Sequence, residues 1–189
     1  MKHLFLAAAF AAAATTGFAA DKYILDSSHS QVLFHYNHLG FSTTYGMFSG
    51  FEGEIVFDQA NPENSSVTVS MPTKSMFTGW ESRTEVFLSE DFLGATDEDL
   101  ISFVSTGIEI TSDTTAKITG DLTLNDITKP VVLDAVLNQV GPHPLSNTQW
   151  AGFDATTTLK RSDFGLGAFA PAVSDEVEVS ISIEAAKVE

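Results

Sequence analysis

Alternation of apolar and polar residues with a period of two runs through most of the chain and restricts its fold class. From Gln31 onward, apolar side chains recur at every second position in successive short segments. Such spacing places the apolar side chains on one face of an extended strand. The segments predicted to be strands are 31–37, 51–57, 67–71, 101–110, 116–124, 131–137, 153–159 and 177–185, with a short first strand at 23–25. The chain is therefore predicted to be all-β.

The connections between these segments are short and contain turn-forming residues, as in Asn125-Asp126 and Gly141-Pro142-His143-Pro144. Eight antiparallel strands joined by hairpins suit either a closed up-and-down barrel or a two-sheet sandwich. A sandwich seals its inner faces against each other, whereas an eight-stranded barrel can hold one small ligand. The periodicity leaves both folds open.

One segment, residues 74–88, departs from the strand pattern. Its large apolar residues have a helical spacing: Met76, Phe77, Trp80 and Phe87. This predicts a short helix of two or three turns near one end of the sheet, and a second short helical piece is expected around 89–93. The sequence shows no internal repeat or linker, so residues 20–189 are predicted to form one domain.

The first residues have the order of a secretory signal peptide. Lys2 precedes an apolar stretch at 4–14, and the small residues Gly17 and Ala19 occupy positions −3 and −1 of a cleavage site after Ala19. The apolar stretch is shorter than the ~20 residues that a membrane-spanning helix requires. We therefore expect residues 1–19 to be a cleaved signal peptide.

Composition and charge exclude several classes of function. The absence of cysteine rules out disulfides, thiol chemistry, zinc–thiolate fingers and iron–sulfur clusters. With 9 Lys+Arg against 25 Asp+Glu, the formal net charge is −16. A surface this acidic repels phosphate backbones and anionic lipid headgroups. We therefore expect no nucleic-acid partner, no stable membrane anchor and little peripheral membrane docking.

Phenylalanine is unusually frequent, with 15 residues against two Trp and three Tyr. Phe has no polar group and favours dry surroundings, and ligand pockets are mostly apolar. The alternative for any single Phe is that it completes the core. The residues predicted to line a ligand cavity are Phe34, Phe41, Phe48, Phe51, Met76, Phe77, Trp80, Phe87, Phe92, Phe103, Phe164 and Phe169. A long hydrocarbon could be held there because each buried methylene contributes about 0.8 kcal/mol.

The sequence has no recognisable catalytic or metal-binding pattern. His35 and His38 are three residues apart, which places them on opposite faces of a strand, and no carboxylate ligand can be identified beside His29. The serine of 46–50 is one place too late for a nucleophile elbow. We therefore predict no catalytic residue, no metal site and no cofactor apart from a bound lipid. An enzyme that uses His29 and His38 as acid–base groups is the alternative.

Several motifs, taken in order, resemble those of one family. They are Ser28-His29-Ser30, His38-Leu39-Gly40, Thr119-Gly120-Asp121-Leu122-Thr123, Thr128-Lys129-Pro130-Val131 and Arg161-Ser162-Asp163-Phe164-Gly165. Their order and spacing are similar to those of the YceI-like family of periplasmic, lipocalin-like polyisoprenoid-binding proteins. The resemblance covers essentially the whole mature chain. It implies a periplasmic, eight-stranded antiparallel barrel whose apolar cavity holds an isoprenoid, an isoprenoid quinone or a similar amphiphile.

The chain departs from the family pattern after Arg83. Thr84 and Phe87 stand where the family usually has Asp and often has His, and Glu98-Asp99 replaces a common Tyr-Pro. These differences leave the preference for a lipid head group open. Arg83 is the residue predicted to contact a polar head group.

The leading functional hypothesis is a non-catalytic periplasmic carrier or store of a long apolar lipid. The alternatives are an enzyme acting on such a lipid and a sealed barrel that serves as a stress or interaction module. Arg161 and Asp163 are expected either to pair or to cap the barrel end. The sequence leaves a homodimer open. A long, dry cavity would favour the carrier.

Overall fold

Ten strands and one short α-helix make up the computed structural model, which describes residues 20–189. The signal peptide expected at 1–19 lies outside the described residues. The strands are β1 (Asp21–Leu25), β2 (Gln31–His38), β3 (Ser42–Phe48), β4 (Glu52–Phe57), β5 (Ser66–Pro72), β6 (Leu100–Ile110), β7 (Thr115–Leu124), β8 (Ile127–Pro142), β9 (Gln149–Lys160) and β10 (Glu176–Lys187). The helix is α1 (Glu81–Leu88), and three short 3-10 helices are η1 (Pro62–Asn64), η2 (Thr73–Ser75) and η3 (Arg161–Phe164). Between residues 20 and 189, no helix combines the length and apolar character needed to cross a membrane.

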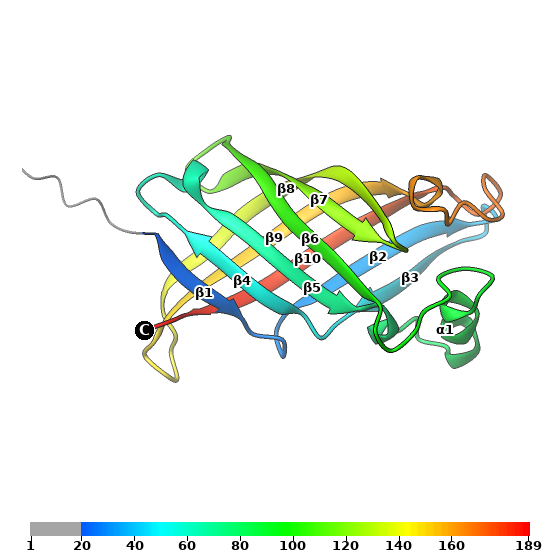
Figure 1. The fold of residues 1–189 in the computed structure, drawn as a ribbon, viewed down its shortest axis with the longest axis horizontal. Helices are drawn as coiled ribbons and strands as arrows, with labels where there is room; N and C mark the ends of the chain where they lie inside the picture. The colour runs from blue at the N-terminus through cyan, green and yellow to red at the C-terminus, as the bar shows by residue number, and fades with distance from the viewer. Residues whose placement is uncertain (1–19) are drawn as a thin grey trace, which may run out of the picture.

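Eight strands close into a ring in the order β1-β4-β5-β6-β7-β8-β9-β10, because β10 also pairs with β1 (Figure 1). Every pairing in the ring is antiparallel. The β2–β3 hairpin extends the same barrel: β10 pairs with β1 through 185–187 and with β2 through 178–182. β1 and β2 therefore lie one after the other along the same edge of β10, and together they fill one strand position of the barrel. The predicted eight-stranded antiparallel barrel with a short helix near one end is confirmed.

The sequence pattern does not predict strand β3. Its register with β2 aligns Gly46 with Phe34 and Phe48 with Val32. The β3 residues on the same face as Gly46 and Phe48 are Ser42 and Thr44, so apolar alternation is missing over most of the strand. Pairing with β2, rather than an apolar pattern, therefore places this segment in the sheet.

The prediction of a helix over residues 74–88 is wrong for the first half of that segment. Only Glu81–Leu88 is α-helical, and Gly79 just before it has a positive φ of 77° that interrupts a helix. Farther back, Phe77 and Met47 of β3 exchange two backbone hydrogen bonds of 2.8 Å. This segment is extended because it covers the free edge of β3.

The second helical piece, expected around 89–93, is a turn. It is closed by a hydrogen bond from the Phe92 amide to the Ser89 carbonyl, 3.0 Å long. The predicted hairpin turn at Asn125-Asp126 is confirmed. Both residues have positive φ, 53° and 58°, as a type I′ turn between antiparallel strands requires.

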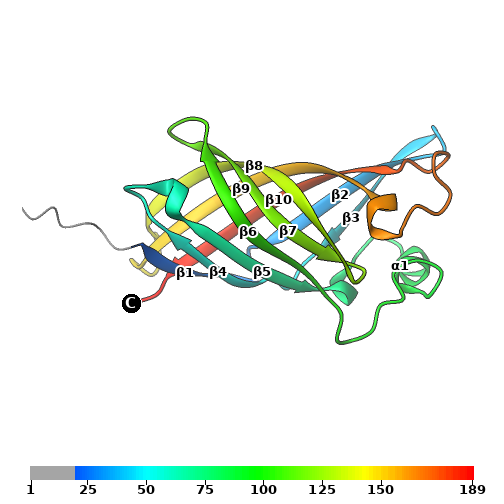
Figure 2. The same cartoon turned by 45° about the horizontal axis from the view of Figure 1, so that its top comes forward.

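The two ends of the barrel carry different segments. Figures 1 and 2 place α1, the β2–β3 turn and the β9–β10 connection (residues 161–175) at one end. The β6–β7 and β8–β9 turns lie at the other end. We call the first end the mouth, because the cavity described below opens there. A tightly packed aromatic core lies away from it, where Tyr23, Phe57 and Phe153 meet edge to face at ring-centroid distances of 6.3 and 5.6 Å.

Candidate binding cavity

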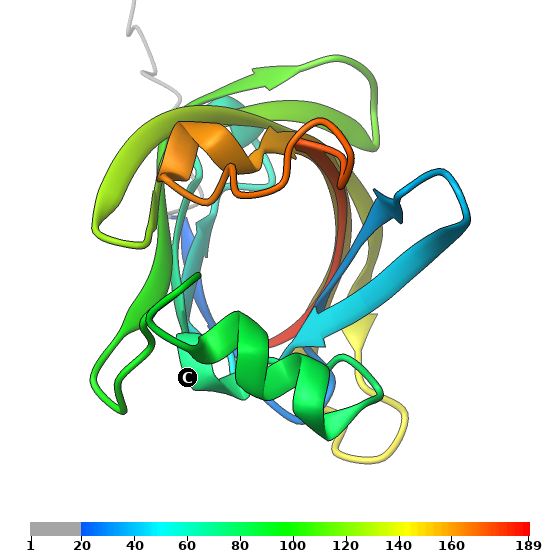
Figure 3. The same ribbon diagram turned by 90° about the vertical axis from the view of Figure 1, so that its right-hand side faces the viewer.

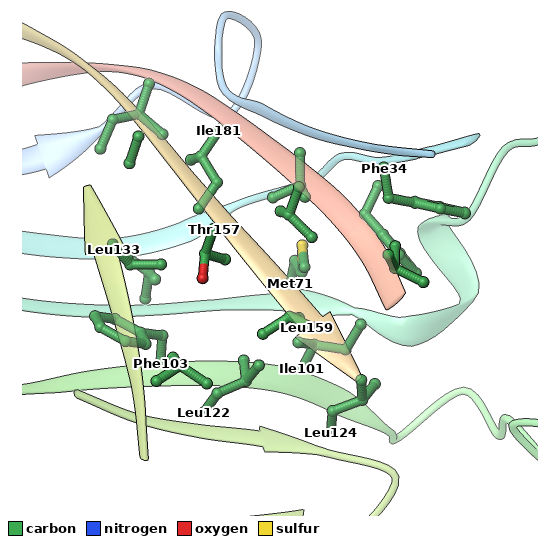
Figure 4. Close-up of a pocket in the computed structure, with 18 of the residues that line it drawn as sticks. Phe34, Met71, Ile101, Phe103, Leu122, Leu124, Leu133, Thr157, Leu159 and Ile181 are labelled. Carbon is green, nitrogen blue, oxygen red and sulfur yellow. The ribbon is translucent and has the colours of Figure 1, made fainter. Parts of the chain in front are cut away.

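A cavity of about 800 Å³ occupies the inside of the barrel, within the size range of small-molecule sites. Strands β2 to β10 all contribute to its walls. Figure 4 shows Phe34, Met71, Phe103, Leu133 and Ile181 among the side chains that surround it. The barrel is therefore hollow, which contradicts the sealed-barrel hypothesis.

Period-two alternation makes the walls apolar. On β10, Val177, Val179, Ile181 and Ile183 face the cavity while the residues between them do not. The other strands contribute further aliphatic side chains that sequence reasoning did not select: Val67, Val69, Ile101, Ile108, Ile110, Ile118, Leu122, Leu124, Val131, Leu133, Leu137 and Leu159. The alternation that identified the strands was the signal that could have identified these residues.

Most of the aromatic residues selected from the sequence do line the cavity. They are Phe34, Phe48, Phe51, Trp80, Phe87, Phe92, Phe103 and Phe169, together with Met76 and Arg83. They come from strands, from α1 and from connections that are far apart in sequence, and the closure of the barrel brings them together. Contact of these residues with a ligand stays a prediction.

Three selected residues do not line the cavity, and the prediction is wrong for them. Phe41 is 91% exposed because it lies in the β2–β3 turn beyond the barrel wall. Phe77 is 61% exposed, since its neighbour Met76 takes the inward position of this extended segment. Phe164 is buried at the end of η3, where it belongs to the packing beneath the β7–β8 turn: its carbonyl accepts a 2.9 Å hydrogen bond from the side-chain amide of Asn125.

Two phenylalanine rings pack against glycines in the wall. A Cβ at Gly46 would lie 2.3 Å from the Phe34 ring, and a Cβ at Gly120 would lie 2.3 Å from the Phe103 ring. Each glycine therefore leaves room for a ring beside the backbone. A glycine inside a strand often marks such a close approach, and Gly120 is an example.

An aromatic chain crosses the mouth. Ring centroids are 6.1 Å apart for Tyr36 and Phe87, 5.7 Å for Phe87 and Phe92, and 6.2 Å for Phe92 and Phe169. These contacts connect the barrel wall, α1 and the 161–175 connection, which face each other across the mouth in Figure 3. Trp80 and Phe169 line the cavity and yet are 64% and 71% exposed, so the cavity is open to solvent beside them.

Arg83 places an incompletely paired cation beside this opening. Its Nη2 donates a 2.6 Å hydrogen bond to the Thr78 carbonyl. Its Nε is buried without any hydrogen-bond partner, the only such side-chain atom in the described part of the chain. Within residues 20–189, no carboxylate forms an ion pair with this guanidinium. An unsatisfied buried donor is costly, so this N–H is suited to an acceptor supplied from the cavity.

Arg161 has a different environment. Its guanidinium donates to the backbone carbonyls of the 161–175 connection at Ser174 (3.0 Å), Val173 (3.1 Å), Ala168 (3.2 Å) and Leu166. The expected pairing with Asp163 is not formed, and the capping role is the one observed. Asp175 instead accepts two hydrogen bonds from Ser162, which lower the pKa of its carboxyl group.

The opposite end of the cavity is polar. Ser112, Asp113 and Thr114 of the β6–β7 turn border it there. The Ser112 hydroxyl lies 2.7 Å from that of Thr115, so these groups already bond to one another. The unpartnered donor of Arg83 is thus at the mouth, beside the aromatic chain from Tyr36 to Phe169.

The histidines selected from the sequence are separated by the whole of β2. His38 lines the cavity at the mouth, whereas His29 lies in the β1–β2 turn outside it. The structure therefore does not assemble the acid–base pair of the alternative hypothesis.

His29 instead has two carboxylates as neighbours, which the sequence alone did not identify. Ligating atoms of Asp26, His29 and Glu184 lie within 4.8 Å of one another, on the outside of the barrel. Nδ1 of His29 is 2.6 Å from a carboxylate oxygen of Asp26. This hydrogen bond is the main reason that the pKa of Asp26 is lowered to about 2, and it raises the pKa of His29. The three side chains form a donor set of a type that binds zinc, but in this geometry the facing atoms of Asp26 and His29 bond to each other.

Comparison with known proteins finds a matching family model, related sequences and related structures. The family model described as YceI-like domain matches residues 23–185. A "UPF0312 protein" of Ectopseudomonas mendocina (strain ymp) is 43% identical over 168 residues, which cover 88% of this chain and 87% of that protein. The crystal structure of the Campylobacter jejuni YCEI protein superposes with a TM-score of 0.73 at 28% identity, covering 81% of this chain and 90% of that one. A polyisoprenoid binding domain from Saccharophagus degradans shares the fold at 14% identity, with a TM-score of 0.68 and coverage of 90% and 100%.

Proposed function

The chain belongs to the YceI-like domain family, and from that premise we propose that it is a non-catalytic carrier or store of a long-chain apolar lipid. The observation that carries the proposal is the hollow barrel, with about 800 Å³ of space behind almost continuous apolar walls. Polyisoprenoids and isoprenoid quinones are the ligand class we favour. The structural neighbour from Saccharophagus degradans, named for polyisoprenoid binding, supports this choice.

The physical reason is that apolar walls stabilise a bound hydrocarbon and offer few hydrogen bonds to polar ligands. Each methylene transferred from water contributes about 0.8 kcal/mol, so a chain of ten or more carbons needs no charged clamp. The inward residues of β7, β8 and β10 are aliphatic along most of each strand. Specificity would then come from the few polar groups at the ends of the cavity.

Arg83 is our candidate for contact with the lipid head group. Its buried Nε–H lacks an acceptor and lies at the mouth, where an amphiphile with its tail in the barrel would place its polar end. A phosphate oxygen or a quinone carbonyl would satisfy that donor. The aromatic neighbours Trp80 and Phe87 would surround the adjoining carbons.

We also propose that the mature protein begins at Ala20 and works in the periplasm. The support is the order of residues in 1–19, with a basic start, an apolar stretch and small residues before the cleavage site. N-terminal sequencing of the protein recovered from a periplasmic fraction tests this. A mature chain that retains Met1 would contradict it.

Native mass spectrometry tests the proposed ligand class. Protein purified from its own periplasm should carry an added lipid mass, or should bind polyprenols or quinones when they are supplied. A matched pair of variants locates the binding. Ala155 faces the cavity whereas its neighbour Thr156 is exposed on the outside.

We expect Ala155→Trp to fill part of the barrel and abolish lipid binding, and Thr156→Trp to leave it unchanged. Circular dichroism and thermal unfolding verify that both variants fold. Repeated failure of the wild-type protein to bind any of these lipids would overturn the proposal, as would equal binding by the two variants.

A further inference from the structure

Large apolar side chains are exposed around the mouth of the barrel. Phe41 in the β2–β3 turn, Trp80 before α1 and Phe169 in the 161–175 connection are 91%, 64% and 71% exposed. Leu39 and Val86 are exposed beside them in the same segments. We call these five residues the rim patch. Single exposed apolar residues are ordinary, but a group drawn from three separate segments around one opening indicates an interaction surface.

The three segments lie at the same end of the molecule. Figure 1 places the β2–β3 turn, α1 and the 161–175 connection together, and Figure 3, viewed onto this end, shows them around the barrel opening. Backbone contacts hold two of them in place. The Leu39 amide donates to the Ala172 carbonyl at 3.0 Å, and His38 forms a β-bridge with Val173.

The charges around the rim patch are acidic. Glu81 and Glu85 of α1 and Glu90 and Asp91 of the following turn are all exposed. Arg83 and Arg161 of these segments keep their positive charges while donating to backbone carbonyls, and the four carboxylates outnumber them. The mouth is therefore apolar at its centre and negatively charged at its margin.

This combination restricts the occupant. An anionic lipid surface is repelled by the acidic margin, and a second copy of the chain would present the same negative charges. A zwitterionic bilayer places ammonium groups outermost, and these are attracted both by carboxylates and by aromatic faces. Below the ammonium groups, aromatic side chains settle at the membrane–water interface.

We propose that the rim patch docks the barrel reversibly on a zwitterionic bilayer, with its mouth against the lipids. A long hydrocarbon could then pass between bilayer and cavity without crossing water. This purpose depends on the proposed lipid-carrying function, although docking itself needs no bound ligand. The net charge of −16 argues against docking on anionic lipid headgroups, and the acidic margin of the mouth agrees with it, but neither opposes a zwitterionic surface.

Vesicle partitioning tests the proposal with phosphatidylcholine alone and with added phosphatidylglycerol. Phe41 does not line the cavity, so Phe41→Ser should weaken partitioning about tenfold and leave the affinity for a lipid supplied in solution unchanged. Phe41→Ser with Phe169→Ser should weaken it about a hundredfold. Leu145→Ser is the matched control, because Leu145 is 93% exposed in the β8–β9 turn at the opposite end. Added phosphatidylglycerol should reduce binding by the wild-type protein.

The two tryptophans report the orientation. Trp80 belongs to the rim patch, whereas Trp150 is the second residue of β9 and lies beside His143 at the far end. In Trp150→Phe, brominated phosphatidylcholine should quench the remaining Trp80. In Trp80→Phe, the same lipid should leave Trp150 unquenched.

Equal quenching of both tryptophans, unchanged partitioning of Phe41→Ser, or a preference for anionic vesicles would overturn the proposal. So would a concentration-dependent dimer that Phe41→Ser abolishes, since the rim patch would then join two copies. Vesicle binding by Ala155→Trp separates the two proposals. If this variant docks but the wild-type protein binds no lipid, the carrier function fails and the docking surface stands.

Discussion

The ring of Phe103 on β6 covers Gly120 on β7 so closely that a methyl group at residue 120 would lie 2.3 Å from the ring Cζ. The space beside the backbone is occupied by the ring, and the ring in turn borders the cavity. Phe34 and Gly46 repeat the relationship on β2 and β3. Pairing a large ring with a glycine lets aromatic side chains cover the wall without filling the barrel.

Gly120→Ala should therefore shift Phe103 toward the cavity. The added Cβ would also lie only 2.6 Å from the Val104 carbonyl oxygen, so the backbone has to move as well. We expect a loss of about 1–3 kcal/mol in the free energy of unfolding and weaker binding of the longest lipids. Chemical denaturation and a lipid-binding titration measure the two effects. Gly107→Ala is the control, because no atom lies within 4 Å of a Cβ there. Equal losses in both variants would contradict this account of the wall.

Arg83→Met should lower the affinity for lipids with an acceptor head group about tenfold to a hundredfold. The reason is that a hydrogen bond to a charged group contributes about 1.5–3 kcal/mol. Binding of a hydrocarbon without a head group should not change, because the apolar walls are intact. Arg83→Lys should restore little, since lysine has no equivalent of the Nε–H. Titrations with a polyprenyl phosphate, a quinone and an unsubstituted polyprene compare the wild-type protein with the two variants. A uniform loss for all ligands would assign Arg83 a structural role only.

Arg161→Met should loosen the mouth. Four carbonyls of the 161–175 connection lose their common donor, so we expect a loss of about 2–4 kcal/mol in the free energy of unfolding. Amides of this connection should exchange hydrogen faster, while amides of β6 and β7 stay protected. Lys160→Met, a change at an exposed neighbour, serves as the control. Unchanged exchange in Arg161→Met would contradict the capping role.

The hydrogen bond between Asp26 and His29 predicts a dependence of stability on pH. His29 has a raised pKa in the folded protein. Its contribution to the free energy of unfolding is therefore fully present below its ordinary pKa of 6.5 and is lost as pH rises through the pKa of the folded state. The pKa of Asp26 is lowered from 3.8 to about 2, so its contribution is present above 3.8 and is lost as pH falls toward 2. NMR titration of the His29 ring should show its pKa falling in Asp26→Asn. A His29 pKa that is the same in both proteins would refute the coupling.

Local sequence patterns predicted most strands but failed where tertiary pairing decides. Strands such as β7 and β10 alternate strictly, so their existence and their inward faces follow from the sequence. β3 carries polar residues and glycine on most of its inner face, and only its partner β2 identifies it as a strand. The extended segment at Met76 and Phe77 has a helical spacing of apolar residues, but hydrogen bonds to Met47 outweigh that local preference.

The residues that line the cavity could also be predicted only in part. Its aromatic lining was largely predictable because Phe favours dry places, but Phe41, Phe77 and Phe164 share that chemistry and lie elsewhere. Whether a side chain faces the cavity, the solvent or a local core depends on strand register and on the path of each turn. Neither can be read from residue type.

The sequence by itself determined the all-β class, the inward alternation of the strands and the apolar character of whatever they enclose, because these depend on neighbours two residues apart. The tertiary structure alone decided that β10 pairs with β1 to close the ring, that the ring stays hollow, and that the exposed aromatic residues gather at one mouth. The physical reason is distance along the chain. Closure and the grouping around the mouth depend on contacts between segments more than a hundred residues apart, such as Tyr23 with Lys187 and Leu39 with Ala172.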